Sequence, residues 1–263
     1  MDFDKRVTWI TGASSGLGEA LAYALSAQGA VLVLSARRQE KLDAVRSWCR
    51  NAGQHLVVPL DLSDPVGIEP AAGKVLAHFG RVDLLINNAG VTQRALAKDT
   101  SLAVDRRIME IDYFAAIALT KAVLPSMLAR RSGRIVVISS VVGRIGTPLR
   151  SAYAASKHAL HGFFDSLRAE VHADGIGVTV ICPGFLRTEV SMHALKGDGT
   201  AYGALDPSQA GGMPPETCAA RVLEAISHGR DEVVIGGRET YGIALHRFFP
   251  ALFRRVIRKI RVT

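Results

Sequence analysis

A tyrosine and a lysine one helical turn apart could exchange a proton with a substrate oxygen. Tyr153 and Lys157 stand at i and i+4 in a segment of helical pattern, so they share one face of a helix. An ammonium near a phenol favours the phenolate, which a phenol needs in order to act as a base near neutral pH. Ser140 precedes Tyr153 by thirteen residues and ends an apolar run, where its hydroxyl could polarise the same oxygen. Alone, a Tyr-x-x-x-Lys pattern is more typical of an ordinary amphipathic helix.

A glycine-rich segment near the N-terminus predicts a phosphate site. The run Thr11–Gly18 follows an apolar strand and opens a helix. We expect Gly12 to permit a tight turn, Gly16 to let the backbone approach a pyrophosphate, and Gly18 to let helix and strand pack closely. The helix N-terminus would offer free N–H groups to the phosphates. Such glycines also mark ordinary turns, so the strand–turn–helix context carries the prediction.

The end of the second predicted strand bears on which dinucleotide fits. A site for NAD usually places an acid there, yet none occurs between Glu19 and Glu40. Arg37 and Arg38 stand there instead, and guanidinium suits a 2′-phosphate. We therefore expect NADP(H) to be preferred over NAD(H), although both arginines could simply begin a solvated helix. Asp61, after the third strand, could accept from the adenine amino group or serve as an N-cap.

Short apolar runs alternate with helical patterns along most of the chain. This alternation predicts βαβ units in a single doubly wound α/β domain over residues 1–263, with a core of about 5–236. The predicted strands are Val7–Thr11, Val31–Ser35, His55–Leu60, Leu84–Asn87, Ile135–Ser139, Val178–Cys182 and Val233–Ile235; the clearest helices are Gly18–Gln28, Glu40–Asn51, Ala115–Arg130 and Ala152–His172. The long aperiodic stretch from Pro183 to Pro215 predicts a loop covering the substrate, with a floppy insertion as the alternative.

Several motifs then fall in one order along the chain. They are Thr11-x-x-x-Gly16-x-Gly18, Asn87-Asn88-Ala89-Gly90, Ser139-Ser140, Tyr153-x-x-x-Lys157 and Pro183-Gly184. In this order the chain resembles the classical short-chain dehydrogenase/reductase family over about residues 5–236. The resemblance implies a Rossmann fold and an NAD(P)-dependent oxidoreductase. Residues 113–170 also resemble the branch called dehydrogenase/reductase member seven, which is linked to lipid, steroid and retinoid carbonyls.

The resemblance also implies residue roles. Tyr153 would be the general acid/base, Ser140 rather than Ser139 would polarise the substrate oxygen, and Lys157 would also bond the nicotinamide ribose. The expected cofactor contacts are Ser14, Ser15 and Leu17 along the pyrophosphate, Leu62 beside Asp61, Asn88, Ala89 and Gly90 against the riboses, and Pro183, Gly184, Leu186 and Thr188 near the carboxamide. Thr188 alone could be a helix cap.

One position departs from the family pattern. The family usually has an asparagine twenty-eight residues before the serine, and this chain has Asp112. In the family that residue helps to hold a water against the lysine. Aspartate keeps an acceptor oxygen, but its charge would attract Lys157 and alter the balance that tunes Tyr153. We therefore place Asp112 at an altered relay position.

Other chemistries find little support in the residue pattern. The three cysteines form no CxxC pair, and the eight histidines show no HxxxH or HExxH spacing, so we predict no metal site. His158 and His161 suggest packing or subunit contact. The N-terminus lacks signal-peptide features, and no apolar run approaches the ~18 residues of a membrane span. These observations favour a reducing, cytoplasmic location.

The C-terminal residues 237–263 form a basic tail. The net charge is +8, and six of the bases follow Glu239 with no acid among them. Helically spaced apolar residues alternate with these bases: Leu245, Phe248, Phe249, Leu252, Phe253, Val256, Ile257 and Ile260 with Arg247, Arg254, Arg255, Arg258, Lys259 and Arg261. Such a helix could lie at a membrane surface, or could cover the substrate site or a neighbouring subunit. No aromatic platform accompanies the bases, so nucleic-acid binding is not expected.

Together these patterns predict an NADP(H)-dependent oxidoreductase that interconverts a small carbonyl, apolar or lipid-like, and an alcohol. Val141, Val142 and Phe185 suggest the apolar pocket. The family commonly forms homodimers or homotetramers, which we expect here. The alternative is a nucleotide-binding redox sensor or scaffold without turnover, but it predicts a damaged catalytic set, and only Asp112 is altered.

Overall fold

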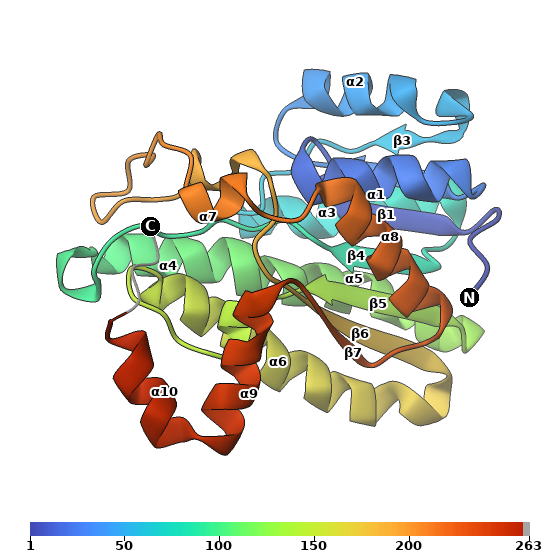
Figure 1. Cartoon of the computed structure of the whole chain (residues 1–263). Coiled ribbons are helices and arrows are strands. Elements are labelled where there is room, and N and C mark those ends of the chain that lie inside the picture. The colour runs from blue at the N-terminus through green and yellow to red at the C-terminus, as the bar shows by residue number, and fades with distance from the viewer. Residues whose placement is uncertain (260–263) are drawn as a thin grey trace.

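A parallel sheet forms the centre of the molecule (Figure 1). The computed structural model describes residues 1–259, so Ile260 and Arg261 of the predicted tail lie outside the described residues. Within these residues one seven-stranded sheet has the order β3-β2-β1-β4-β5-β6-β7, with every pairing parallel. Its strands are β1 (Val7–Thr11), β2 (Val31–Ser35), β3 (Leu56–Val57), β4 (Leu84–Asn87), β5 (Gly133–Ile138), β6 (Ile176–Pro183) and β7 (Glu232–Ile235). The doubly wound α/β prediction is therefore confirmed.

Helices cover both faces of this sheet, as its nearly continuous apolar strands require. The first core cluster joins the sheet to α3 (Ile68–Phe79), α5 (Ala115–Arg130) and α6 (Ser151–Val171). The second joins its other face to α1 (Gly16–Ala27), α2 (Gln39–Trp48) and α8 (Pro215–Ser227). The predicted helix α5 has the expected bounds, while the other three differ by a few residues at their ends.

The third strand is shorter than predicted. We expected His55–Leu60, but only Leu56 and Val57 pair in register with β2. The chain still follows β2 beyond that point, since Val58 donates to the Leu34 carbonyl and Leu60 to the Ala36 carbonyl. As the edge of the sheet, this segment has a neighbour on one side only, so irregular backbone costs little pairing there.

The order of the strands reverses between β1 and β4, and this reversal places the site. From β1 the chain winds outward through β2 and β3, then returns to β4 on the other side of β1. The loops that leave the carboxyl ends of β1 and β4 therefore diverge, and a crevice opens between them. The glycine turn and the Asn88–Gly90 turn are these two loops.

One long helical segment contains an irregular turn. Helix α4 (Leu102–Met109) continues through a π-helical turn, η4 (Glu110–Phe114), into α5. Its span Leu102–Arg130 is the one helix in residues 1–259 that is long and apolar enough to cross a membrane by length and composition alone. In this fold the α5 part packs on the sheet, with Leu119, Val123 and Met127 fully buried.

The segment after β6 folds back on itself and contacts the loop after β4. It contains the short turn η7 (Glu189–Ser191) and helix α7 (Pro207–Ala210). Isolated parallel bridges join Leu186 to Met213, and Gln93, in the loop after β4, to Leu195. We name residues 184–214 the covering segment. The Gln93–Leu195 bridge joins this segment to the body, while the Leu186–Met213 bridge joins its two ends, and several of its residues line the cavity.

Two short helices end the described chain. Helix α9 (Tyr241–Phe248) and helix α10 (Pro250–Ile257) are joined at Phe249, and Pro250 begins the second helix as predicted. Phe253 is buried with Val141 and Ile145, so the pair packs against the loop that follows β5. We call α9 and α10 the C-terminal hairpin.

Candidate active site

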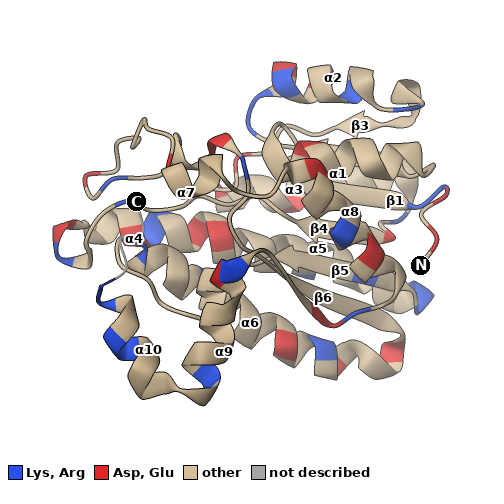
Figure 2. Cartoon of the chain, in the orientation of Figure 1, with Lys and Arg blue, Asp and Glu red and all other residues tan. Residues whose placement is uncertain are grey.

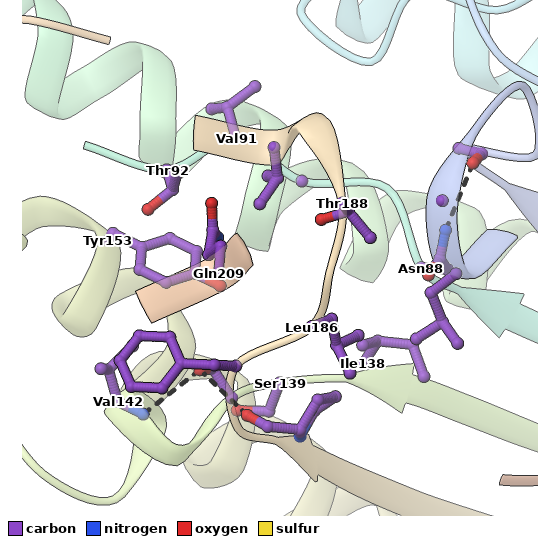
Figure 3. A pocket seen from close by; sticks show the side chains of 18 of the residues that line it. Asn88, Val91, Thr92, Ile138, Ser139, Val142, Tyr153, Leu186, Thr188 and Gln209 are labelled. Atoms are coloured by element: carbon purple, nitrogen blue, oxygen red, sulfur yellow. Dashed lines mark hydrogen bonds between the residues drawn. The ribbon is translucent and has the colours of Figure 1, made fainter. Parts of the chain in front are cut away.

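A cavity of about 1870 Å³ follows the carboxyl edge of the sheet from β2 to β6. The glycine turn, the arginines after β2 and the polar residues of β5 and α6 all border it. Figure 3 shows Asn88, Tyr153, Leu186 and Thr188 around this one pocket. Of the predicted site residues, all border the cavity except Gly18, Asp112 and Lys157, which lie behind its wall.

The glycine turn has the geometry that its residue types predicted. Gly12 has a φ of +66°, and a Cβ there would come within 2.9 Å of the Cα of Ala89. A Cβ on Gly18 would lie 2.2 Å from the Gly12 carbonyl oxygen, so the start of α1 packs directly on the turn. Gly16 faces the cavity at the first residue of α1. The backbone is therefore bare where a ligand would approach the N-terminus of α1.

The turn after β4 is tied to the glycine turn by hydrogen bonds. The Asn88 side-chain amide donates to the Thr11 carbonyl at 2.9 Å. The Thr11 hydroxyl accepts from the backbone N–H groups of Asn88 and Ala89, at 3.0 and 3.1 Å. These bonds hold the two loops of the crevice in one fixed arrangement.

The arginines after β2 lie at one end of the cavity. Arg37 and Arg38 both border it and are exposed, and neither has an ion pair among residues 1–259. The Asp61 Oδ1 accepts from the N–H and the hydroxyl of Ser63, at 2.9 and 2.7 Å. Burial would raise the pKa of Asp61, but these two bonds and the charge of Arg37 hold it below its ordinary value. Asp61 is thus a carboxylate within a turn, and its Oδ2 is left for another donor.

At the other end of the cavity Ser140 and Tyr153 share the wall. The Ser140 hydroxyl accepts from the Val142 N–H at 3.3 Å and lies 3.4 Å from the Pro183 carbonyl oxygen (Figure 3). Ser139 is buried instead, and its hydroxyl lies 2.9 Å from the His161 Nε2. The alternation of side chains along β5 therefore separates the two serines, with Ser140 on the cavity side.

Lys157 lies behind Tyr153. Its Nζ donates to the Ile138 carbonyl at 3.1 Å and lies 5.6 Å from the centre of the Tyr153 ring. A Cβ on Gly90 would lie 3.3 Å from the same Nζ and 3.1 Å from the Asp112 Oδ1, so the turn after β4 packs closely on this pair. The side chain is almost fully buried, which makes it a fixed charge close to the phenol.

Asp112 is buried beside that ammonium. It sits in the π-helical turn η4, and its Oδ2 lies 3.8 Å from the Lys157 Nζ. Its Oδ1 accepts from the Val91 N–H at 2.7 Å, and its Oδ2 accepts from the Ser156 hydroxyl at 3.0 Å. Burial raises the pKa of Asp112, while Lys157 and these two donors act in the opposite direction. The structure thus places Asp112 against Lys157, as the sequence predicted.

His161 belongs to a buried polar network under the site. Its Nε2 lies 3.6 Å from the Cys182 Sγ. A ring nitrogen of His161, the sulfur of Cys182 and a carboxylate oxygen of Glu232 all lie within 4.8 Å of one another. Arg144 is paired with the Glu232 carboxylate. Burial, followed by the charge of Arg144, lowers the pKa of His161 to about 4. Burial also raises the pKa of Cys182 to about 12. A neutral imidazole, a thiol and a paired carboxylate are arranged here as a packing network.

The sequence did not indicate a buried ion cluster at the covering segment. The Asp206 Oδ2 pairs with Arg94 at 3.0 Å and with Arg150 at 3.2 Å, and all three residues are buried. Burial, with the adjacent charge of Arg94, lowers the pKa of Arg150 to about 10. We call this cluster the Asp206 clamp. Its members are up to 112 residues apart, so no local spacing could have revealed it.

Glu239 is a second residue that sequence analysis missed. Its Oε1 accepts from the N–H groups of Phe185 and Gly237, at 3.2 and 2.9 Å. A Cβ on Gly184 would lie 1.9 Å from the same oxygen. Glu239 therefore joins the start of the covering segment to the start of the C-terminal hairpin.

Comparisons with known proteins agree with this geometry. The short chain dehydrogenase family matches residues 6–198. A relative named dehydrogenase/reductase SDR family protein 7-like, from Anopheles gambiae, is 45% identical and covers 97% of this chain and 82% of its own. A solved short-chain dehydrogenase from Streptomyces avermitilis is 32% identical with a TM-score of 0.83, covering 99% of this chain and 100% of its own.

Two further solved structures contain nucleotides. A metagenomic short-chain oxidoreductase in complex with NADP is 29% identical with a TM-score of 0.72, covering 89% of this chain and 98% of its own. A short-chain dehydrogenase/reductase from Burkholderia phymatum in complex with NAD has a TM-score of 0.82 over 100% of this chain and 98% of its own, and at 24% identity it shows the fold alone. The two neighbours therefore hold different nucleotides.

Proposed function

The chain belongs to the short-chain dehydrogenase/reductase family and is an oxidoreductase, and we propose that it interconverts a ketone or aldehyde and the corresponding alcohol with NADP(H) as the preferred nucleotide. One observation carries this proposal. Tyr153 and Ser140 border the same cavity as the bare glycine turn, and Lys157 is fixed directly behind Tyr153.

The cavity residues fit a dinucleotide. The crevice holds two turns whose glycines leave the backbone uncovered, and it extends from Arg37 to Tyr153. The residues that would hold the nucleotide are Gly12, Ser14, Ser15, Gly16 and Leu17 at the pyrophosphate, Asp61 and Leu62 at the adenine, Asn88, Ala89, Gly90 and Lys157 at the riboses, and Pro183, Gly184, Leu186 and Thr188 at the carboxamide. Gly18 supports the turn from behind. When bound, the dinucleotide supplies a hydride for reduction or accepts one in oxidation.

The protein's own residues would manage the substrate oxygen and its proton. Ser140 Oγ donates a hydrogen bond to that oxygen, and Tyr153 Oη delivers the proton as the carbonyl is reduced. In oxidation the same Oη receives the proton. The buried ammonium of Lys157 favours the phenolate that this step leaves, and its bond to the Ile138 carbonyl keeps the charge in place.

Asp112 would hold Lys157 from the side away from the cavity. Its hydrogen bonds to the Val91 N–H and the Ser156 hydroxyl fix the carboxyl group, so its oxygen remains near the Lys157 Nζ. We place Asp112 as a positioning residue that also sets the charge balance around Tyr153.

The walls near Tyr153 favour an apolar substrate. Val142, Ile145, Phe185 and Leu245 border the cavity there, and Val142 and Ile145 are buried. Burial of apolar substrate atoms against such walls contributes about 25 cal/mol per Å². The homodimer or homotetramer and the cytoplasmic location stay predictions.

The test of the proposed reaction is NADPH consumption with a panel of ketones and aldehydes of increasing chain length. We expect turnover by the native protein and a loss of about 10²–10⁴-fold in Tyr153→Phe, because the proton donor is removed. Binding of NADPH, measured by fluorescence, should remain close to native in the variant. Equal turnover in the two proteins would remove the mechanism, and nucleotide binding without turnover of any substrate would support the scaffold alternative.

The double variant Arg37→Ser/Arg38→Ser tests the preference for NADPH over NADH. Loss of charge-assisted hydrogen bonds should raise the KM for NADPH by about 10- to 100-fold. The KM for NADH should change little, because NADH has no 2′-phosphate. Arg50→Ser, an exposed arginine beyond α2, is the matched control. An equal change in both KM values would show that the two arginines do not read the 2′-phosphate.

A further inference from the structure

The C-terminal hairpin presents large apolar side chains to solvent. Phe248 and Phe249, where α9 meets α10, are 68% and 62% exposed, and Leu252 is 48% exposed. The opposite side of the hairpin is packed, because Phe253 is buried against Val141 and Ile145. One face of the hairpin therefore packs on the body, while the junction of α9 and α10 is exposed to solvent. Tyr241 and Val256 are exposed on the same hairpin, and a group of exposed apolar side chains of this kind is typical of an interaction surface.

The same hairpin carries only positive charge. Arg247, Arg254, Arg255, Arg258 and Lys259 all lie on it or just after it, and no acid occurs from residue 240 onward. None of the five has an ion pair among the residues that the structure describes. Figure 2 shows blue segments on α9 and α10. The natural complement of this surface is an extended negative surface with an apolar interior.

The cavity reaches the hairpin as well. Leu245, Phe248, Phe249 and Val256 border it, although Phe248 and Phe249 are mostly exposed. Side chains that face both the cavity and the solvent mark the place where the cavity opens. One opening of the cavity therefore lies at the exposed junction of the hairpin, in addition to the exposed nucleotide end at Arg37 and Arg38.

We propose that the C-terminal hairpin docks on an anionic lipid bilayer, with Phe248, Phe249 and Leu252 inserted and the arginines at the headgroups. The cavity then opens toward the lipid, so an apolar carbonyl substrate passes from the bilayer to Tyr153 without crossing water. This last step rests on the proposed function. A second copy of the chain is a poorer partner, because two such hairpins facing each other would bring ten like charges together.

Co-sedimentation of the full chain with vesicles tests the docking. We expect binding to vesicles of phosphatidylcholine with phosphatidylserine, weaker binding to phosphatidylcholine alone, and a loss of binding at high salt. Arg254→Glu/Arg255→Glu should weaken binding by at least about 30-fold, and Phe248→Ser/Leu252→Ser by about 100-fold. Lys74→Glu/Lys121→Glu, which makes the same charge change at exposed positions on α3 and α5, is the control and should bind almost as the native protein does.

Several results would overturn the docking proposal. They are failure of the native protein to bind the anionic vesicles, native binding by the hairpin variants, or an equal loss in the Lys74/Lys121 control. A change in oligomeric state caused by Phe248→Ser/Leu252→Ser, without any vesicle binding by the native protein, would assign the surface to a second copy. Turnover of a short water-soluble ketone without vesicles separates this proposal from the proposed reaction. Arg254→Glu/Arg255→Glu, which lies outside the cavity wall, should keep that turnover.

Discussion

At the scale of single residues, Asp112 makes this site differ from the one that the family resemblance implies. A carboxylate there has no access to solvent, and its neighbours are Lys157, Ser156 and the Val91 N–H. Burial is the largest influence on its pKa and raises it. In the proposed reaction we expect the negative charge of an ionised Asp112 to oppose the phenolate that Lys157 favours.

Asp112→Asn tests this charge directly. The amide can still accept from the Val91 N–H and bond Ser156, so we expect the fold and the activity to be retained or the activity to rise. Removing a negative charge near the phenol should move the pH profile of alcohol oxidation toward lower pH. Asp165→Asn, an exposed acid on α6, is the matched control. An unchanged profile for Asp112→Asn would show that Asp112 is electrically uncoupled from Tyr153 and Lys157.

The sequence could predict residues whose role depends on local spacing. Tyr153 and Lys157 share a helix face, and strand alternation favours Ser140 over Ser139; the structure places the two serines in different surroundings, and the catalytic role of Ser140 stays a prediction. The exposed pair Arg37 and Arg38 was placed correctly at the cavity end, although its role stays a proposal. Asp206 and Glu239 could not be found in this way, because their partners are distant along the chain.

At the scale of elements, the covering segment is joined to the body by backbone hydrogen bonds and by the Asp206 clamp. The Asp206 clamp joins α7 both to the loop after β4 and to the start of α6, three residues before Tyr153. The Asp206 N–H also donates to the Ser191 hydroxyl at 3.0 Å, which ties α7 to η7. The clamp therefore couples the position of the covering segment to the helix that carries Tyr153 and Lys157.

Asp206→Ala should be strongly destabilising. It leaves two buried arginines without their carboxylate, which costs about 3–5 kcal/mol in the free energy of unfolding. The measurement is urea unfolding followed by circular dichroism. Asp198→Ala, an exposed acid on the same segment, should change stability little and is the control.

If Asp206→Ala fails to fold, Asp206→Asn tests the same clamp. It keeps part of the hydrogen bonding, and we expect its KM for the carbonyl substrate to rise more than its kcat falls, because the covering segment is loosened. An Asp206→Ala protein as stable as the native one would show that the clamp does not hold the segment.

At the scale of the whole molecule, the alternation of apolar runs and helical patterns was enough to predict the parallel sheet and the position of its crevice. It did not predict the short β3, because an edge strand has pairing on one side only and the residue pattern does not show which strand is the edge. It also did not predict the π-helical turn at Asp112, which lies between α4 and α5. The single-domain prediction stays a prediction.

The buried imidazole of His161 should make the free energy of unfolding depend on pH. His161 has a native pKa of about 4 against 6.5 in the unfolded chain, with burial as the main cause and Arg144 as the next. Between these values the unfolded chain binds a proton that the native protein does not, so the free energy of unfolding falls as the pH falls from 6.5 to 4. One such group contributes about 2–3 kcal/mol.

His161→Gln removes that contribution. Unfolding by urea at several pH values should show a smaller loss of stability in the variant than in the native protein over this range. Arg144, Glu232, Cys182, Asp165 and His158 surround the imidazole, and His158→Gln, which changes an exposed histidine on α6, is the control. The same acid loss in His161→Gln and the native protein would contradict a neutral buried imidazole.

The central claim is that a hydride passes from the nucleotide to a carbonyl carbon in this cavity while Tyr153 protonates the carbonyl oxygen. The most direct measurement follows deuterium from NADPH deuterated at both C4 positions into the alcohol product by mass spectrometry, for the native protein and for Tyr153→Phe. The native protein should give an alcohol with one deuterium on the carbinol carbon, and the variant should form it about 10²–10⁴-fold more slowly. An unlabelled alcohol, or equal rates in the two proteins, would contradict the account.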